Sequence, residues 1–242
     1  MTRIRLGMLT PSSNTVLEPA TSRMLLGLPE VSAHFGRFRV TQIGLSAEAL
    51  RQFDPAPVLD AARLLADAHM DVIAWNGTSA GWLGFDSDKR LCAAITEATG
   101  VPATSSVLAV NEAFRRLGAR TLGLVSPYTA DVQARIVANY AAAAIPIIAE
   151  RHLDDPGNYS FARYEEPEIA AMVRDVGRAR PDAITTLCTN MRAPGIVAAM
   201  EAETGIPILD SIAAVVWKSL LLAGVDPSRV HGWGELFQRL PA

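Results

Sequence analysis

The sequence predicts an α/β fold of two pseudo-symmetric duplicated lobes, each a mainly parallel sheet flanked by helices. First, short apolar runs alternate along the chain with amphipathic helical patterns, as in parallel sheets with helical crossovers. Second, four segments of the first half recur in the same order in the second half. The chain of 242 residues is also long enough for two lobes, at about 100 to 120 residues each.

The elements of the first half follow from their apolar patterns, taken in chain order. Two buried strands are predicted, over residues 4–9 and 72–75. Three helices are predicted, over residues 54–69, through residues 91–98, and over residues 107–117. Asp54 and Pro55 form the start signal of the first of these helices, and Gly100 ends the second. Strands that alternate with helices in this way form a parallel sheet.

The internal repeat predicts the second lobe. The matched pairs are residues 6–11 with 122–127, 71–73 with 182–184, 97–102 with 203–207, and 105–107 with 210–212. Four matches in one order favour a duplication over the ordinary reuse of strand–turn–helix patterns in α/β proteins. We expect a first lobe of residues 1–116, joined by the C-terminal helix and tail 217–242. The second lobe is then residues 117–216, with the active site between the lobes.

Composition excludes several classes of function. The net charge is −3, with no block of basic residues, which argues against a nucleic-acid partner. No apolar run reaches the ~18 residues of a membrane span, and no secretory signal is recognisable. We therefore expect a cytoplasmic protein with no membrane partner, whose Cys92 and Cys188 stay reduced. Neither a metal-ligand cluster nor a glycine-rich phosphate loop is present, so we expect no metal and no cofactor.

Two loops that follow equivalent strands form the candidate site. Residues 76–79 (NGTS) follow the strand 72–75, and the repeat aligns them with residues 187–190 (LCTN). Ligands of open α/β sheets bind at the carboxyl ends of strands, and N–H groups at a helix start favour an anion. We therefore expect Gly77 and Cys188 to approach one anionic ligand from opposite sides.

The first-half motifs resemble the aspartate/glutamate racemase superfamily, and within it the branch of maleate cis-trans isomerases and arylmalonate decarboxylases. Residues 7–14 (GMLTPSSN) are similar to the isomerases' first loop, whose Pro-Ser-Ser-Asn run binds a substrate carboxylate. Residues 77–79 (GTS) resemble the decarboxylases' motif, in which glycine replaces a cysteine and the Thr-Ser pair holds carboxylate oxygens. The resemblance therefore implies substrate-binding roles for Pro11, Ser12, Ser13, Asn14, Thr78 and Ser79.

The second-half motifs resemble the same branch, so that the similarity covers nearly the whole chain. Residues 126–128 (SPY) are similar to the loop whose tyrosine hydroxyl joins the carboxylate-binding hole, which implies that role for Tyr128. Residues 187–192 (LCTNMR) match the second cysteine loop in a form closer to the isomerases, and residues 232–237 (GWGELF) resemble the tail of the decarboxylases. This implies that Cys188 is catalytic, with substrate-binding roles for Thr189 and Asn190.

These residues predict a cofactor-independent decarboxylase of a malonate-type dicarboxylate that carries a second substituent, an aryl group among others. Racemisation needs an acid and a base on opposite faces of a planar enediolate. With Gly77 on one face, Cys188 alone can exchange a proton, and this suits decarboxylation. Two alternatives stay open: a maleate-type cis-trans isomerase or racemase of a small carboxylate, and a non-catalytic carboxylate-binding protein.

Several of these residues also have a purely structural interpretation. Cys188 has the character of a small buried hydrophobe, as does Cys92 within its helix. Thr78, Ser79, Ser13 and Asn14 are all suited to capping helices. Gly77 is suited to a positive φ angle or to a close backbone approach. We expect Trp75 and Trp82 to pack in the core. Arg192 is either a carboxylate clamp or a solvated charge. Residues 154–164 are expected to form a lid or a pocket wall.

Overall fold

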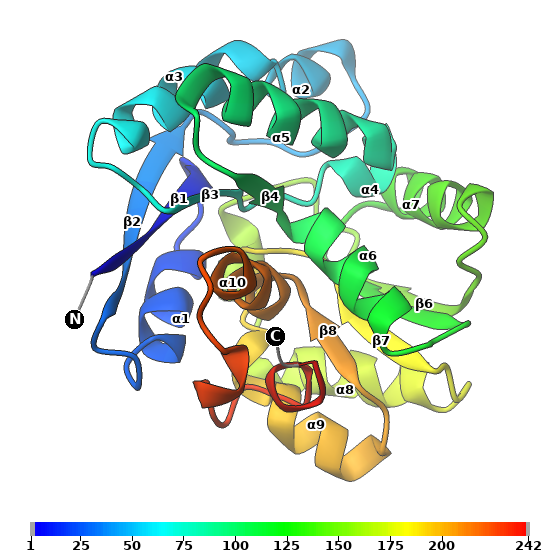
Figure 1. Ribbon diagram of the computed structural model, residues 1–242. Helices are drawn as coiled ribbons and strands as arrows, with labels where there is room; N and C mark the ends of the chain where they lie inside the picture. Colours follow the sequence, from blue (N-terminus) through cyan, green and yellow to red (C-terminus); the bar gives the residue numbers. More distant parts are fainter. Residues whose placement is uncertain (1–2, 241–242) are drawn as a thin grey trace.

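The computed structural model describes residues 3–240, which form two four-stranded sheets, one in each half of the chain (Figure 1). The first sheet has the order β2-β1-β3-β4 and the second the order β6-β5-β7-β8. The first comprises β1 (Ile4–Pro11), β2 (Val31–Phe38), β3 (Val72–Trp75) and β4 (Ala103–Ser105). The second comprises β5 (Leu122–Ser126), β6 (Ile147–His152), β7 (Ala183–Thr186) and β8 (Ile208–Asp210). Neighbouring strands are parallel throughout both sheets, so the predicted fold class is confirmed.

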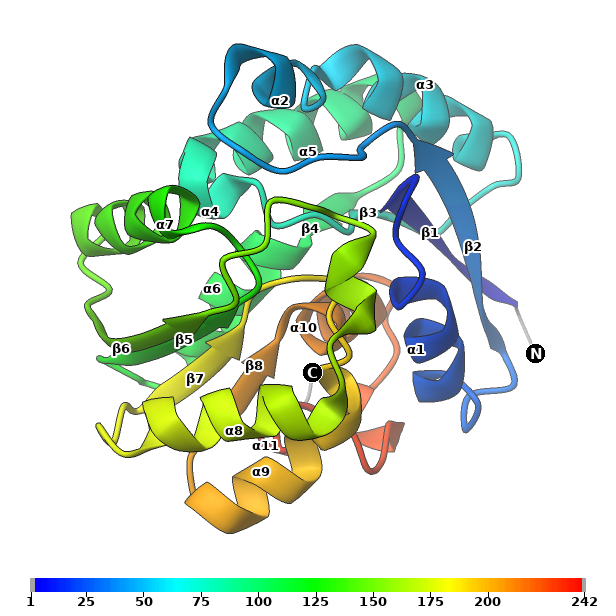
Figure 2. The same cartoon turned by 180° about the vertical axis from the view of Figure 1, so that it is seen from behind.

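Helices connect the strands and cover the sheets. In the first half they are α1 (Leu17–Met24), α2 (Ala47–Arg51), α3 (Pro55–Ala66), α4 (Ala80–Leu83), α5 (Phe85–Thr99) and α6 (Ser106–Arg116). In the second half they are α7 (Ala130–Ala142), α8 (Glu166–Gly177), α9 (Val197–Thr204), α10 (Ser211–Leu222) and α11 (Leu236–Arg239), with 3₁₀ turns η1 (Ser160–Arg163), η2 (Pro194–Ile196) and η3 (Pro227–Arg229). Figure 2 shows α3 and α5 at one end of the molecule and α8 and α9 at the other.

Local sequence signals fix where these helices begin and end. Asp54 caps α3 by accepting a hydrogen bond from the Ala56 N–H at 3.0 Å. α5 ends at Gly100, whose φ of 70° is in the left-handed region that glycine adopts without strain. The capping of α6 by Ser105 is repeated in the second half, where Asp210 caps α10. The duplication therefore extends to the residues that start equivalent helices.

The edge strands β2 and β6, one in each sheet, are absent from the elements predicted by apolar runs. Each pairs with a single neighbour, β2 with β1 and β6 with β5. Their sequences, VSAHFGRF and IIAERH, mix polar with apolar residues, and both strands are only partly buried. A strand at a sheet edge needs less apolar surface than the central strands, which are buried on both faces.

Helices α6 and α10 pack against each other between the two sheets (Figure 1). α10 follows the last strand of the second sheet, yet it also packs against β3 and β4 of the first. The predicted boundary between residues 216 and 217 falls inside this helix, and the division of the chain into lobes stays a prediction. None of the helices within residues 3–240 has the length and apolar character needed to cross a bilayer.

Candidate active site

A small cavity of ≈ 20 Å³ lies where the carboxyl ends of strands from the two sheets meet. The first half of the chain lines it with Pro11, Val40, Ile43, Phe53, Trp75, Gly77, Thr78, Ser79 and Trp82. The second half lines it with Tyr128, Asn158, Cys188 and Thr189. Because one water needs about 10 to 15 Å³ of such space, a dicarboxylate enters only if lining side chains move.

The structure brings most of the predicted site residues to this cavity, but not all of them. Those that line it are Pro11, Gly77, Thr78, Ser79, Tyr128, Cys188 and Thr189. Those that do not are Ser12, Ser13, Asn14 and Asn190. Asn158 lines it as well, and it belongs to the loop of residues 154–164 that we expected to form a lid or a pocket wall.

Thr78 and Tyr128 bring hydroxyl groups from the two halves into contact. The Thr78 Oγ1 and Tyr128 Oη atoms are 2.5 Å apart. The Tyr128 ring packs edge-on against Trp82, with ring centroids 5.1 Å apart, and against Phe161 at 5.6 Å. Burial and the neighbouring Cys188 raise the pKa of Tyr128 well above its ordinary value. The hydroxyl therefore stays protonated and can donate a hydrogen bond to an oxyanion.

Ser79 stands at the start of α4, where the sequence allowed either a capping role or a ligand-binding role. Its side chain makes no capping hydrogen bond, although the residue is buried. Ser79 and Thr78 thus present two hydroxyl groups at the same turn on the first-half side of the cavity. Hydroxyl groups in this arrangement suit the oxygens of a bound carboxylate.

Cys188 lies at the carboxyl end of β7 and is only 3% exposed. The Asn190 backbone N–H donates to the Sγ atom at 3.3 Å. Burial raises the pKa of the Cys188 thiol to about 12, while the Asn190 N–H and the Tyr128 hydroxyl act in the opposite direction. The group is therefore a neutral thiol at neutral pH, which is the form that can donate a proton.

Gly77 lines the same cavity as Cys188, and the reason for a glycine at this position is steric. Its backbone is outside the left-handed region, so a positive φ does not explain the glycine. A Cβ atom at this position would instead overlap the Cζ2, Cε2 and Cη2 atoms of the Trp75 ring. Trp75 is 2% exposed and packs on Phe38, with ring centroids 5.1 Å apart. The indole ring therefore occupies the space that a side chain at residue 77 would need.

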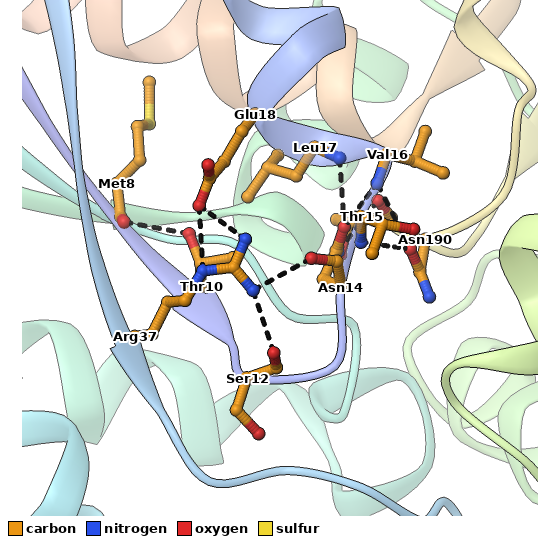
Figure 3. Close-up of polar contacts among 11 residues, drawn as sticks. Met8, Thr10, Ser12, Asn14, Thr15, Val16, Leu17, Glu18, Arg37 and Asn190 are labelled. Carbon is orange, nitrogen blue, oxygen red and sulfur yellow. Dashed lines mark hydrogen bonds and ion pairs between the residues drawn. The ribbon is translucent and has the colours of Figure 1, made fainter.

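Both polar atoms of the Asn14 amide bond to protein groups, and the carboxylate-binding role that the resemblance implies stays a prediction. Its Oδ1 accepts from the Val16 and Leu17 N–H groups at 3.0 and 2.9 Å, which caps the start of α1 (Figure 3). Its Nδ2 donates to the Thr189 O and Oγ1 atoms at 3.0 and 3.1 Å. Asn14 thereby ties the first half of the chain to the cysteine loop of the second.

Asn190 makes the reciprocal connection from the second half to the first. Its Oδ1 accepts from the Thr15 N–H at 2.9 Å, as Figure 3 shows, and its Nδ2 donates to the Asn158 carbonyl at 2.6 Å. Asn158 in turn donates to Ser13 Oγ at 2.8 Å. The predicted residues Ser13, Asn14 and Asn190 thus form a polar network behind the cavity wall.

Arg37 is a contributor that no sequence pattern indicated. It lies on β2, and its Nη1 donates to the carbonyl oxygens of Ser12 and Asn14 at 2.8 and 3.0 Å (Figure 3). Its guanidinium also pairs with Glu18 at 2.6 Å. Because β1 and β2 are parallel neighbours, Arg37 lies opposite Thr10 and can hold the loop that follows β1. The contact of Arg37 with the loop after β1 follows from the pairing of β1 with β2, which the sequence did not predict.

Two other candidates lie away from the cavity. Arg192 lines a separate pocket of ≈ 150 Å³ together with Arg23 and Glu166. Cys92 is buried on α5, and burial raises its pKa to about 12. Within residues 3–240 there is no group of three or more His, Cys, Asp or Glu side chains placed to hold a metal ion.

Sequence comparison relates the chain to two kinds of enzyme. The family model described as arylmalonate decarboxylase matches residues 15–237. Arylmalonate decarboxylase of Bordetella bronchiseptica is 28% identical over 235 residues, covering 96% of this chain and 95% of that protein. Maleate isomerase of Geobacillus stearothermophilus is 26% identical over 227 residues, covering 89% of this chain and 90% of that protein.

Solved structures of both kinds share the fold. A mutant of the Nocardia farcinica maleate cis-trans isomerase with a covalently bound succinylcysteine intermediate has a TM-score of 0.89 at 26% identity, covering 98% of this chain and 99% of that one. A crystal structure of arylmalonate decarboxylase has a TM-score of 0.79 at 27% identity, covering 98% of this chain and 100% of that one. Sequence and fold thus point to one family that holds two activities.

Proposed function

This chain belongs to the arylmalonate decarboxylase and maleate isomerase family of the aspartate/glutamate racemase superfamily, and from this membership we propose that it decarboxylates a 2-substituted malonate without a cofactor. The observation that carries the proposal is that the Trp75 ring fills the space that a side chain at residue 77 would need. In this proposal one face of the substrate meets Gly77, which offers no acid, base or nucleophile, and Cys188 acts on the other face.

The hydroxyl groups around the cavity hold the carboxylate that the product retains. Thr78, Ser79 and Tyr128 line one cavity, and the Tyr128 hydroxyl stays protonated because its pKa is raised. When the bond between C2 and the second carboxylate breaks, its electron pair moves into an enediolate on the retained carboxylate, and carbon dioxide leaves. Donors aimed at the developing oxyanion stabilise this intermediate more than the substrate.

Cys188 then supplies the proton that completes the reaction. The S–H bond breaks, its proton goes to C2 of the enediolate, and the resulting thiolate recovers a proton from solvent. A thiol whose pKa is about 12 is a neutral donor at neutral pH, and the Asn190 N–H at 3.3 Å stabilises the transient thiolate. Since the Trp75 ring covers the opposite face, a chiral product forms with one hand in excess.

The test is a proton-NMR assay in deuterium oxide with substituted malonates, maleate and amino acids. The proposal expects loss of carbon dioxide from a malonate and one deuteron at C2 of the product, with no added metal or cofactor. Isomerisation of maleate without any decarboxylation would contradict it. The same assay in the presence of EDTA checks the independence from metals.

The second candidate is a cis-trans isomerase or racemase of a small dicarboxylate. It is favoured by the isomerase-like loops at residues 11–14 and 188–192 and by the TM-score of 0.89 to the Nocardia farcinica isomerase. An adduct on cysteine, of the kind that structure holds, requires a thiolate nucleophile. Here Cys188 would have to supply it, and its raised pKa opposes this role.

A further inference from the structure

The carboxyl ends of β7 and β8 bring a buried carboxyl group close to Cys188. The two strands are paired, and Asp210 is in register with Thr186. Thr186 Oγ1 donates to Asp210 Oδ2 at 2.7 Å, and the Thr186 carbonyl accepts from the Cys188 N–H at 3.2 Å. Asp210 is completely buried and does not line the catalytic cavity. It is therefore connected to Cys188 through one residue, on the side of the cysteine loop away from the cavity.

Asp210 is ionised at neutral pH although it is buried. Burial raises its pKa to about 6, and hydrogen bonds from backbone N–H groups and from the Thr186 hydroxyl act in the opposite direction. Its Oδ1 accepts from the Ile212 and Ala213 N–H groups, both at 2.9 Å, at the start of α10. The dipole of a helix favours a negative charge at this end. The carboxylate form is therefore the main form of Asp210 above about pH 6.

The charged groups on the elements around β8 have other partners. β7 carries none, and the charged side chains of the helices packed against β8 are those of Glu112, Arg115, Arg116, Lys218, Glu201 and Glu203. Lys218 pairs with Glu112 at 2.7 Å, and Glu201 accepts from the Ile208 N–H at 2.8 Å. Hydrogen-bond donors from β7 and the start of α10 thus hold the Asp210 carboxylate.

The first half of the chain has an uncharged residue at the equivalent position. Ser105 is in register with Trp75 as Asp210 is with Thr186, and it caps α6 as Asp210 caps α10. Serine and aspartate cap helices about equally well. Capping therefore does not explain why the half that carries the thiol has a carboxylate at this position.

The charge of Asp210 acts on the sulfur of Cys188. Burial is the main cause of the raised pKa of this thiol, and the Asp210 charge acts in the same direction, against the Asn190 N–H and the Tyr128 hydroxyl. A like charge nearby disfavours the thiolate. Attack on carbon requires the thiolate, and so does removal of a proton from carbon. Donation of a proton requires the neutral thiol, which the carboxylate favours.

We propose that Asp210 is a positioning residue that acts through Cys188, and that its charge restricts the sulfur to proton donation by suppressing nucleophilic attack and proton abstraction. Its value for catalysis rests on the decarboxylase proposed above. The thiolate left after protonation of C2 lies close to the carboxylate, which favours recovery of a proton from solvent over removal of the product's α-proton. The effect on the sulfur of the free protein rests on the arrangement of β7 and β8 alone.

The reactivity of Cys188 toward 2,2′-dipyridyl disulfide tests this effect without any substrate. Cys92→Ala serves as the parent protein, so that one thiol remains. The thiolate attacks one sulfur of the reagent, the S–S bond breaks, a mixed disulfide forms, and pyridine-2-thione leaves. The rate in the parent should rise less than tenfold per pH unit near about pH 6, where Asp210 ionises. Asp210→Asn should match the parent at about pH 5 and exceed it about two- to sixfold at about pH 8.

The pH dependence separates the effect of charge from that of a loosened fold. A more accessible thiol would react faster at every pH, including the range in which Asp210 is protonated. Burial raises the pKa values of Asp88 and Glu201 to about 7, but both groups are present in the parent and in the variants, so the difference between the profiles isolates residue 210.

Two further variants and the parent itself complete this test. Asp210→Ser copies Ser105 and should follow Asp210→Asn, whereas Asp226→Asn alters the exposed cap of η3 and should follow the parent. Profiles of the residue-210 variants that coincide with the parent, or lie above it at every pH, would overturn the inference. The shallow rise near about pH 6 needs no substitution at residue 210, and a full tenfold rise per pH unit in the parent would overturn it as well.

Proton exchange in deuterium oxide tests the consequence for catalysis. The carboxylate product of an accepted malonate is incubated with each protein; the thiolate takes the α-proton, the electron pair moves into the enediolate, and a deuteron returns to carbon. The ratio of exchange to decarboxylation should be at least about twofold higher in Asp210→Asn. An unchanged ratio would overturn the role in specificity. The expected disulfide profile without turnover of any malonate overturns the decarboxylase alone, whereas an unshifted profile in an active decarboxylase overturns this inference alone.

Discussion

The two strand-end loops have the same origin in the repeat but opposite surroundings. In the second half, Thr186 ends β7, and its Oγ1 donates to Asp210 Oδ2 at 2.7 Å. In the first half the equivalent residue is Trp75, whose large ring covers Gly77. A small strand-end residue thus accompanies the thiol of Cys188, and a large one accompanies the glycine. The two loops therefore differ at a pair of positions, residues 75 and 77 in the first half and residues 186 and 188 in the second.

The largest loss of activity is expected when the thiol of Cys188 is removed. Cys188→Ala should lower kcat by at least about 100-fold and by up to about 10,000-fold, the range of general acid catalysis. Cys92→Ala is the matched control and should keep nearly full activity, because Cys92 is buried on α5 away from the cavity. Steady-state decarboxylation assays on both variants check this. Retention of a tenth of the activity by Cys188→Ala would rule out the thiol as the acid.

The second largest loss of activity is expected when the hydroxyl contact between Thr78 and Tyr128 is removed. Tyr128→Phe removes a donor that contacts Thr78 Oγ1 at 2.5 Å. Loss of one oxyanion donor costs about 100- to 1000-fold in kcat, with a smaller change in KM. Thr78→Val should behave similarly, since the two groups act on the same oxygens. A variant of either kind that changes KM alone would show that the pair binds substrate without stabilising the intermediate.

The third prediction transplants the second-half pair into the first half. Gly77→Cys alone should destabilise the protein by about 1–3 kcal/mol, because the new side chain overlaps the Trp75 ring. Trp75→Thr with Gly77→Cys should relieve this overlap and place a second thiol opposite Cys188. We expect the double variant to exchange the product's α-proton with deuterium oxide and to lose stereochemical purity. Thermal unfolding and NMR measure the two effects, and a folded double variant without exchange contradicts the facing geometry.

The fourth prediction concerns the buried carboxyl group behind Trp75. Burial raises the pKa of Asp88 to about 7 in the folded protein, whereas in the unfolded chain this pKa is about 3.9. The folded state therefore keeps a proton that the unfolded state has lost, and stability falls as pH rises through this window. Between about pH 4.5 and 8, wild type should lose on the order of 1–3 kcal/mol more than Asp88→Asn. Urea unfolding at both pH values measures this difference, and parallel pH profiles would contradict it.

The smallest effect is expected at the Arg37 clamp on the loop after β1. Arg37→Leu removes hydrogen bonds to the Ser12 and Asn14 carbonyls and should cost about 1 kcal/mol of stability, with a few-fold loss of kcat. Glu18→Gln is the control, because it weakens only a half-exposed ion pair. Equal effects of the two substitutions would show that the ion pair, and not the loop, accounts for the role of Arg37.

Sequence patterns predicted the elements that are buried on both sides and the loops that follow them. Residues 72–75 form a fully buried run, and the repeat aligned Gly77 with Cys188. The sequence did not predict that Val40, Ile43 and Phe53 line the cavity. No sequence pattern indicates that these residues lie near a strand end that is distant in the chain.

The position of a polar residue in a motif does not show which partners its side chain has in the fold. Asn14 and Asn190 lie in the predicted loops, and one atom of each amide bonds to the backbone of the opposite half, while the other bonds within its own half. Trp75 fills the space beside Gly77 because of the orientation of its ring, which packs on Phe38. The sequence alone does not indicate this orientation.

The reciprocal hydrogen bonds of Asn14 and Asn190 join residues 175 positions apart in the chain. Contacts of such long range form late in folding, since the entropy of closing the intervening loop opposes them until both halves are ordered. The cavity wall therefore exists only once nearly the whole polypeptide has folded, and neither half can assemble it alone. In a refolding experiment, activity should return with the slowest phase, after most of the helical circular dichroism has recovered.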